Sequence, residues 1–329
     1  MGLVPLIFYV ILCILLLSKL LAMIPSRAKK RITDKLSECG ISVAEEEENK
    51  LCDIVVRRKR FWTRNLVMPN VGLNDGYIHE DWITTDLEKC LTRLIDRNYL
   101  SLSTFQRRMD LGDDLYRAML DPYWQYSCGW WLPNIHSLEA AQNYKMELVC
   151  TKLQLYAGLR VLDIGCKWGG LLQYMQERYK VIGIGLATSQ EHITLGKKLF
   201  PKVTFVLEDH RTYCTKHPEE FDRAVCIEHD IDYSSVRNVL KKDSLFLIEN
   251  TQPLDHLCGQ VKGLFRFETV SDVAIYYART LSEWKKRAIS SYTTLQSTEC
   301  RSLIYYLTVH SVAFALRRIP FWQVMLSSS

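Results

Sequence analysis

Apolar residues fill the N-terminal segment of the chain almost without interruption, from Leu3 to Ile24. About 20 apolar residues are enough for a helix to cross a bilayer. A cleaved signal peptide is disfavoured because no basic residue precedes Lys19 and the segment ends in Ala-Met-Ile-Pro, a poor cleavage site. A buried helix is usually amphipathic, whereas this segment is apolar all round. The pattern therefore predicts a transmembrane anchor over residues 3–24.

Basic residues follow this segment in two clusters, residues 27–31 and residues 57–60. Positive charge next to a membrane span predicts that the body of the protein lies on the cytoplasmic side, which describes a single-pass membrane protein. The net charge of the chain is only +5, and neither zinc-finger spacing nor an RNP pattern accompanies the clusters. We therefore expect an anionic membrane surface as their partner, and no nucleic acid.

The 11 cysteines are scattered along the chain and include no Cys-x-x-Cys pair. An odd number of dispersed cysteines is typical of reduced thiols in a globular interior and argues against a disulfide scaffold. No Cys/His spacing of the zinc-binding kind is present, so we expect no metal site.

Two regions follow the predicted anchor in this chain of 329 residues. Residues 27–105 are mixed in pattern, with a helical periodicity near residues 87–95, and are predicted to form an N-terminal accessory region. Residues 106–329 are predicted to form one α/β domain. Within it, a helical pattern from about Leu138 to Val149 leads to a short apolar run, Arg160–Ile164, which is typical of a buried strand.

The buried strand leads directly into a glycine-rich segment, Gly165-Cys-Lys-Trp-Gly-Gly170. A helical pattern over residues 171–178 and a second apolar run over residues 181–186 follow, which together predict a βαβ unit in a parallel sheet. Ligands of such sheets bind at the carboxyl ends of the strands. Glycines there let the backbone approach the ligand, and the helix N-terminus offers free N–H groups.

Three interpretations of this loop compete: a bare turn, a dinucleotide site and an S-adenosylmethionine (SAM) site. The third glycine and the distal acid of a dinucleotide site are not clearly met. Asp163, two residues before Gly165, instead has the methyltransferase spacing, in which the acid accepts a hydrogen bond from the ammonium end of the cofactor. The loop therefore favours a class I SAM-dependent methyltransferase, a Rossmann-like α/β fold.

Separated motifs of the chain resemble, in the same order, those of the cyclopropane-fatty-acyl-phospholipid synthases and the related mycolic acid cyclopropane synthases. The segment QYSCGWW is similar to the family's QYSCAYW, and VLDIGCKWGG is similar to its VLDIGCGWGG. The resemblance extends from about Met109 to Leu326. The motifs that carry it are residues 110–116, 125–131, 137–142, 161–170, 280–284 and 319–324.

The resemblance implies transfer of a methylene group from SAM to the double bond of an unsaturated acyl chain in a membrane phospholipid. The alkene attacks the sulfonium methyl group, and a base then removes a proton from the resulting carbocation. In the family, bound bicarbonate is that base. The product, a cyclopropane or a methyl branch, stays open, as does the oligomeric state, a homo-oligomer included.

The resemblance also assigns roles to residues of this chain. Tyr126, Ser127, Gly165, Cys166 and Gly169 would contact the methionine end of the cofactor. Ser189 falls in the ribose-contacting turn, Asp209 and His210 fall where the family contacts the adenine, and Cys128 and Glu228 match the bicarbonate site.

Simpler interpretations exist for several of these residues. Cys128 could be an inert buried thiol, and Glu228 could be a solvated residue at a strand end. Asp209 could cap a turn, as Asp commonly does.

The chain departs from the family pattern at functional positions. Lys167 stands where the family has the middle glycine of the loop, and its cation would repel a sulfonium. Glu249 and Thr251 replace a His and an Ile of the bicarbonate site. We therefore predict that Glu249 is the base in place of bicarbonate. The alternative is a catalytically inactive methyltransferase-fold protein that binds lipid or a partner, because fold does not imply function.

Overall fold

The computed structural model of the chain describes residues 26–48, 51–102, 112–291 and 298–328. These form two compact units. The first unit comprises residues up to Leu111 together with Ala288–Leu316, and the second comprises Gly112–Arg287 and Arg317–Ser329. The predicted boundary at residues 105/106 stays a prediction, and the two units interleave along the chain.

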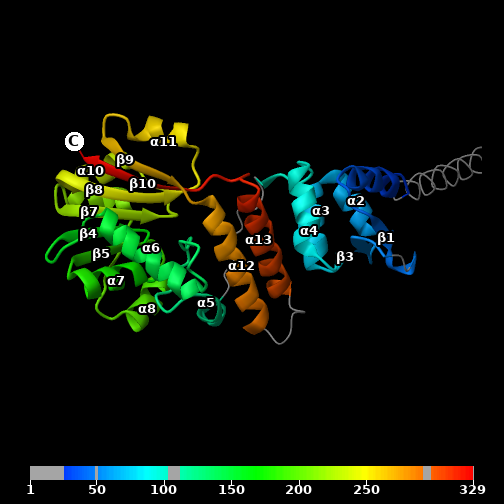
Figure 1. Cartoon of the computed structure of the whole chain (residues 1–329), viewed down its shortest axis with the longest axis horizontal. Helices are drawn as coiled ribbons and strands as arrows, with labels where there is room; N and C mark the ends of the chain where they lie inside the picture. The colour runs from blue at the N-terminus through cyan, green and yellow to red at the C-terminus, as the bar shows by residue number, and fades with distance from the viewer. Residues whose placement is uncertain (1–25, 49–50, 103–111, 292–297, 329) are drawn as a thin grey trace, which may run out of the picture. The chain divides into compact units, whose positions relative to one another are not determined.

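The second unit contains a seven-stranded sheet in the order β6-β5-β4-β7-β8-β10-β9 (Figure 1). Neighbouring strands from β6 to β8 are parallel, whereas β10 is antiparallel to both β8 and β9. The strands are β4 (Arg160–Ile164), β5 (Ile182–Ala187), β6 (Thr204–Leu207), β7 (Phe221–Ile227), β8 (Leu240–Asn250), β9 (Phe265–Asp272) and β10 (Trp322–Ser328).

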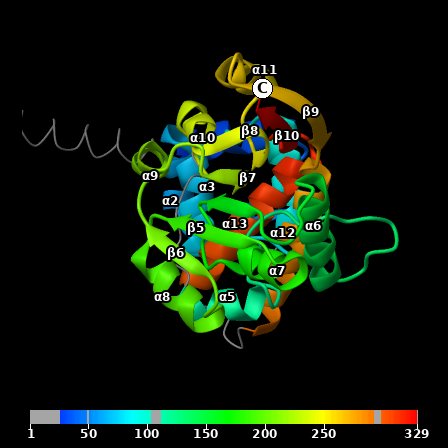
Figure 2. The same ribbon diagram turned by 90° about the vertical axis from the view of Figure 1, so that its left-hand side faces the viewer.

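Helices cover both faces of this sheet. In Figure 2, α6 and α7 lie on one side of the parallel strands and α9 and α10 on the other. The central strand β4 is therefore buried on both faces, which agrees with the apolar side chains of Val161, Leu162 and Ile164. The helices are α5 (Asp113–Met119), α6 (Leu138–Lys152), α7 (Gly170–Tyr179), α8 (Gln190–Leu199), α9 (His210–Lys216), α10 (Tyr233–Val239), α11 (Leu254–Val261) and α12 (Ala274–Ser291), the last of which belongs to this unit up to Arg287.

The first unit is mostly helical. Residues 26–38 form a helix, and a small sheet contains β1 (Val43–Glu45), β2 (Ile54–Val56) and β3 (Trp82–Ile83). The remaining elements are a short 3-10 helix, η1 (Glu46–Glu48), and the helices α2 (Arg60–Val67), α3 (Pro69–Ile78), α4 (Leu87–Asp96) and α13 (Thr298–Ala315).

The core of the first unit joins segments that are far apart in the sequence. Leu36 and Leu94 from the N-terminal part are fully buried in one cluster with Tyr305 and Val309 of α13. The N-terminal region therefore completes its core with residues contributed from near the C-terminal end.

The membrane prediction requires correction. Residues 3–24 lie outside the described residues, and no helix within the described part of the chain is long and apolar enough to cross a bilayer. The two longest described helices, α12 and α13, have 18 residues each, but both carry charged side chains. The prediction of a single-pass membrane protein with its body on the cytoplasmic side is contradicted by this finding, and we do not carry it further.

Candidate functional site

The loop between β4 and α7 has a backbone that only particular residues tolerate. Gly165 and Gly169 have φ angles of 77° and 87°, in the left-handed region that favours glycine. A Cβ atom on Gly165 would lie 2.7 Å from the His229 ring. A Cβ atom on Gly170 would lie 1.7 Å from the carbonyl oxygen of Tyr123. The glycines therefore let the loop pass close to neighbouring backbone and side chains at the carboxyl end of β4.

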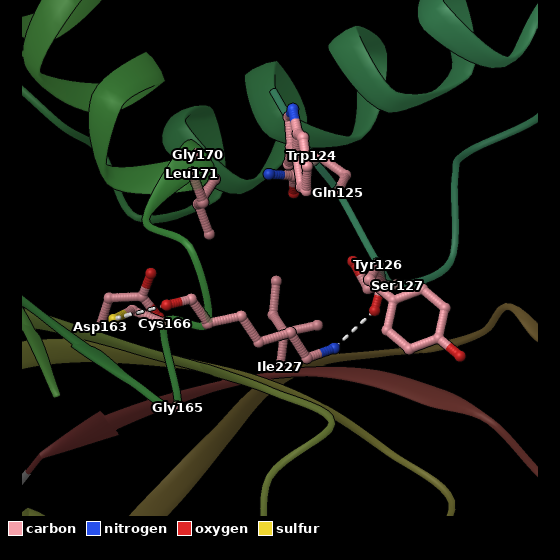
Figure 3. A pocket seen from close by; sticks show the side chains of 11 residues that line it. Trp124, Gln125, Tyr126, Ser127, Asp163, Gly165, Cys166, Gly170, Leu171 and Ile227 are labelled. Atoms are coloured by element: carbon pink, nitrogen blue, oxygen red, sulfur yellow. Dashed lines mark hydrogen bonds between the residues drawn. The ribbon is translucent and has the colours of Figure 1, made fainter. Parts of the chain in front are cut away.

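This loop and the segment Trp124–Ser127 line a cavity (Figure 3). The cavity holds about 40 Å³, well below the roughly 300–1,000 Å³ of a typical small-molecule pocket, so a cofactor-sized ligand requires part of the lining to move. The lining residues are Trp124, Gln125, Tyr126, Ser127, Asp163, Gly165, Cys166, Lys167, Gly170, Leu171 and Ile227.

Two lining side chains carry opposite charges. Asp163, at the end of β4, is only 4% exposed, and burial raises the pKa of its carboxyl to about 7, although the cations Lys145 and Lys167 oppose this increase. The Lys167 ammonium donates a hydrogen bond to the carbonyl oxygen of Tyr126 at 2.5 Å and lies 5.1 Å from the centroid of the Tyr126 ring. The end of the Lys167 side chain is therefore held at the Tyr126 segment, and the residue as a whole is partly exposed.

Lys145 fixes the segment that faces the loop. Its ammonium donates to the Ser127 hydroxyl at 2.9 Å and to the side-chain oxygen of Gln125 at 2.6 Å. Gln142, one helical turn earlier on α6, donates to the Ser127 carbonyl at 2.9 Å. Lys145 is 1% exposed, and burial lowers its pKa, while the negative charges of Glu249, Asp121 and Glu228 oppose that shift.

Lys145 and Gln142 were not predicted from the sequence. Both lie on the face of α6 that also buries Ala141, Met146 and Val149. Two polar residues inside an otherwise apolar helical face are the signal that could have identified them.

Adjacent parallel strands bring together a second set of polar residues. Glu228 follows β7 and Glu249 lies on β8, and the Glu228 amide donates to the Glu249 carbonyl oxygen at 2.9 Å. The Glu249 carboxylate, 2% exposed, accepts a hydrogen bond from Gln323 at 2.8 Å, and the Glu228 carboxylate accepts one from the Tyr277 hydroxyl at 2.7 Å. Glu249 Oε2 and Glu228 Oε1 are buried and have no hydrogen-bond partner among the described residues. Each carboxylate therefore keeps one oxygen available.

Burial and the nearby negative charges favour the protonated forms of Glu249 and Cys128. Burial raises the pKa of Glu249, Lys145 opposes the increase, and Glu228 adds to it. Burial also raises the pKa of the Cys128 thiol well above its usual range, and the charges of Glu249 and Glu228 raise it further. Cys128 is therefore a neutral thiol beside two carboxylates, and the structure brings together the three residues predicted for the reaction centre.

The other predicted cofactor residues have structural partners of their own. The Ser189 hydroxyl caps α8 by accepting from the His192 amide at 3.2 Å, and the Asp209 carboxylate caps α9. His210 is buried, its Nε2 accepts a hydrogen bond from the Asp232 amide at 2.9 Å, and its Nδ1 lies 3.8 Å from Asp209 Oδ2 with no hydrogen bond to any described residue. These residues follow β5 and β6, outside the lining of the cavity, so their ribose and adenine roles stay predictions.

Comparison with known proteins identifies relatives over most of the chain. The family model of mycolic acid cyclopropane synthetase matches residues 98–249. The cyclopropane-fatty-acyl-phospholipid synthase of Escherichia coli K12 is 28% identical over 356 aligned positions, which cover 89% of this chain and 91% of that protein. Cyclopropane mycolic acid synthase 3 of Mycobacterium tuberculosis is 37% identical over 98 positions, 30% of this chain and 34% of that protein.

Solved structures share the fold. The cyclopropane synthase MmaA2 from Mycobacterium tuberculosis has a TM-score of 0.57 and 23% identity, covering 67% of this chain and 95% of its own. Coclaurine N-methyltransferase, solved with N-methylheliamine and S-adenosylhomocysteine, has a TM-score of 0.62 and 15% identity, covering 79% of this chain and 99% of its own. These similarities confirm the predicted class I SAM-dependent methyltransferase fold.

Proposed function

The chain belongs to the family of cyclopropane-fatty-acyl-phospholipid synthases and mycolic acid cyclopropane synthases, which are SAM-dependent methyltransferases, and we propose that it transfers one carbon from SAM to an unsaturated acyl chain of a phospholipid. One observation carries this proposal. A glycine-rich cofactor loop faces the Tyr126–Ser127 segment across a cavity, and two carboxylates lie close by, Glu228 directly after β7 and the buried Glu249 on the neighbouring strand β8.

The residues of the cavity fit the cofactor. Gly165 has no side chain to obstruct the loop, and the buried carboxylate of Asp163 provides a counter-charge for an ammonium group. Tyr126 and Ser127 would contact the methionine end, where Lys145 holds the Ser127 hydroxyl in place. When bound, SAM supplies an electrophilic methyl group on a sulfonium. The small volume of the cavity requires a movement of its lining, and Lys167 is the long side chain that crosses it.

Glu249 is the base of the proposed reaction. Its Oε2 atom has no hydrogen-bond partner, while Gln323 holds the other oxygen at 2.8 Å. Burial raises the pKa of this carboxylate, so it binds a proton more tightly than an exposed glutamate does. A general base works best when its pKa lies near the operating pH. The resemblance assigns Cys128 and Glu228 to a bicarbonate site, but a third anion beside the carboxylates of Glu228 and Glu249 would be repelled. Bicarbonate is therefore not required in this proposal.

Two measurements test the function against its rival, an inactive methyltransferase-fold protein. Calorimetric titration with SAM should detect binding. The full chain should then transfer label from methyl-labelled SAM to vesicles of a phospholipid with a cis-unsaturated acyl chain, and not to vesicles of the matched saturated lipid. Binding without transfer would favour the inactive protein, and the absence of binding would contradict the enzyme altogether.

A further inference from the structure

The lining of the cavity contains one carboxylate and one ammonium group. Asp163, within β4, and Lys167, in the glycine-rich loop that follows, are the charged members of its described lining. An amino-acid head group, which carries one ammonium and one carboxylate, has the complementary pair of charges. The lining therefore matches a zwitterion better than it matches a purely cationic ligand.

Lys167 occupies a backbone position that disfavours any side chain. Its φ angle is 51°, in the left-handed region that L-residues other than glycine adopt at an energetic cost. The family motif that this segment resembles, VLDIGCGWGG, has glycine at this position. A strained residue that persists beside a ligand cavity is often maintained for function.

The hydrogen-bond acceptor that Lys167 contacts is an uncharged carbonyl, which attracts an ammonium less strongly than the carboxylate of a ligand would. Its ammonium donates to the uncharged carbonyl of Tyr126 at 2.5 Å and lies near the aromatic face of the same residue. A carboxylate acceptor adds the Coulomb attraction of a full negative charge to the ammonium, which the dipole of a carbonyl does not supply. A carboxylate that entered the cavity would therefore displace the Tyr126 carbonyl as the acceptor.

We propose that Lys167 is a cofactor-binding residue that pairs with the carboxylate of the methionine end of SAM, while Asp163 accepts a hydrogen bond from the ammonium of the same end. This inference rests on the proposed function and deepens it, because it makes the site selective for a zwitterionic head group. On cofactor binding, the ammonium of Lys167 moves from the Tyr126 carbonyl to the carboxylate, and this movement opens the small cavity. The carboxylate then also neutralises the lysine charge that would otherwise repel the sulfonium.

Binding of SAM and of decarboxylated SAM, measured by calorimetry, tests the proposal. Decarboxylated SAM lacks only the carboxylate. Wild type should bind SAM about 10–100-fold more tightly than the decarboxylated analogue, the range expected for one charge-assisted hydrogen bond. Lys167→Met keeps the length of the side chain without its charge and should reduce this ratio to within about threefold. Lys167→Arg keeps the charge and should retain most of the preference.

Lys180 provides a matched control. It also has a left-handed backbone, with φ 57°, and it lies at the other end of α7, where its exposed side chain donates to the carbonyl of Glu177. Lys180→Met should leave both affinities unchanged. Lys167→Gly and Lys180→Gly should both raise the melting temperature by relieving backbone strain, but only Lys167→Gly should lose the preference for the carboxylate.

Three results would overturn the inference. Equal affinity of wild type for SAM and its decarboxylated analogue would remove the role of the carboxylate but leave the proposed function standing. Tighter SAM binding by Lys167→Met or Lys167→Gly would identify Lys167 as an obstruction. Failure of wild type to bind either compound would overturn this inference and the proposed function together.

Discussion

Asp163 connects the burial of a single residue with the pH dependence of cofactor binding. Its carboxyl has a pKa of about 7 because it is almost fully removed from water. An ammonium group bound beside it would favour the charged form and lower this pKa. Below about pH 7 binding must therefore release a proton, whereas above it the carboxylate is already ionised.

We predict that SAM affinity increases between about pH 5 and pH 7, by up to roughly tenfold per pH unit at the acidic end, and then levels off. Calorimetric titrations at several pH values measure this slope. Asp163→Asn cannot ionise and should show weaker binding with little slope over the same range. An equally steep slope in Asp163→Asn would assign the effect to another group.

Substitution of Glu249 tests its proposed role as the base. Glu249→Gln keeps the size of the side chain and its contact with Gln323 but removes its basicity, so it should reduce turnover by about 10²–10⁴-fold, as expected for a general base. SAM affinity should change little, and added bicarbonate should not stimulate the wild type. Glu268→Gln, an exposed position on β9, is the control and should retain activity. Strong bicarbonate dependence of the wild type would contradict the assignment.

Individual residues also mark the limit of what the sequence could predict. The spacing of Asp163 and Gly165 and the QYSC motif were enough to predict residues that line one cavity. Lys145 belongs to no such motif, and a lysine in a helix is usually solvated, so only its place on an apolar helical face indicated its burial. Its burial depends on Gln125 and Ser127, which lie 20 and 18 positions away in the sequence.

Among the elements, α7 shows how close packing places the cofactor loop. Its first residue, Gly170, lies against the backbone of Tyr123, and a Cβ atom added to it would lie only 1.7 Å from the Tyr123 carbonyl oxygen. Gly170→Ala should therefore force the loop and the Trp124–Ser127 segment apart, reduce the free energy of unfolding by at least about 2 kcal/mol and weaken SAM binding.

Gly259 is the matched control for this substitution. It lies within α11, and a Cβ atom there would have no neighbour within 4 Å. Gly259→Ala should stabilise the protein by about 0.5–1 kcal/mol, because alanine favours a helix interior. Chemical denaturation measures both changes. Equal effects of the two alanines would show that the contact with Tyr123 does not constrain the loop.

The local hydrophobic patterns predicted the helix and strands around the loop, but they did not predict which distant strands pair with one another. The predicted strand Arg160–Ile164 has the bounds of β4, and the predicted helix and second strand match α7 and β5 within one residue at each end. By contrast, β10 inserts between β8 and β9 and brings Gln323 to Glu249 across 74 positions. Such a pairing depends on long-range packing that a local hydrophobic pattern does not contain.

On the scale of the whole molecule, the described residues of the cavity and of the carboxylate pair all belong to the second unit. The first unit has its own core, to which α13 contributes from residues far along the chain. A contiguous division of the sequence could not predict this interleaving, because α13 lies between two of the motifs that resemble the family, residues 280–284 and 319–324. Stability and cofactor binding can therefore be perturbed separately.

Leu94→Ala tests this separation. Leu94 is fully buried in the core of the first unit, so its truncation should lower the free energy of unfolding by about 2–5 kcal/mol. SAM affinity, measured below the unfolding transition, should stay within about twofold of wild type, since independent sites usually act additively. Leu162→Ala, in β4 beside Asp163, should instead reduce both stability and affinity. A loss of SAM affinity in folded Leu94→Ala as large as that in Leu162→Ala would mean that the first unit takes part in binding the cofactor.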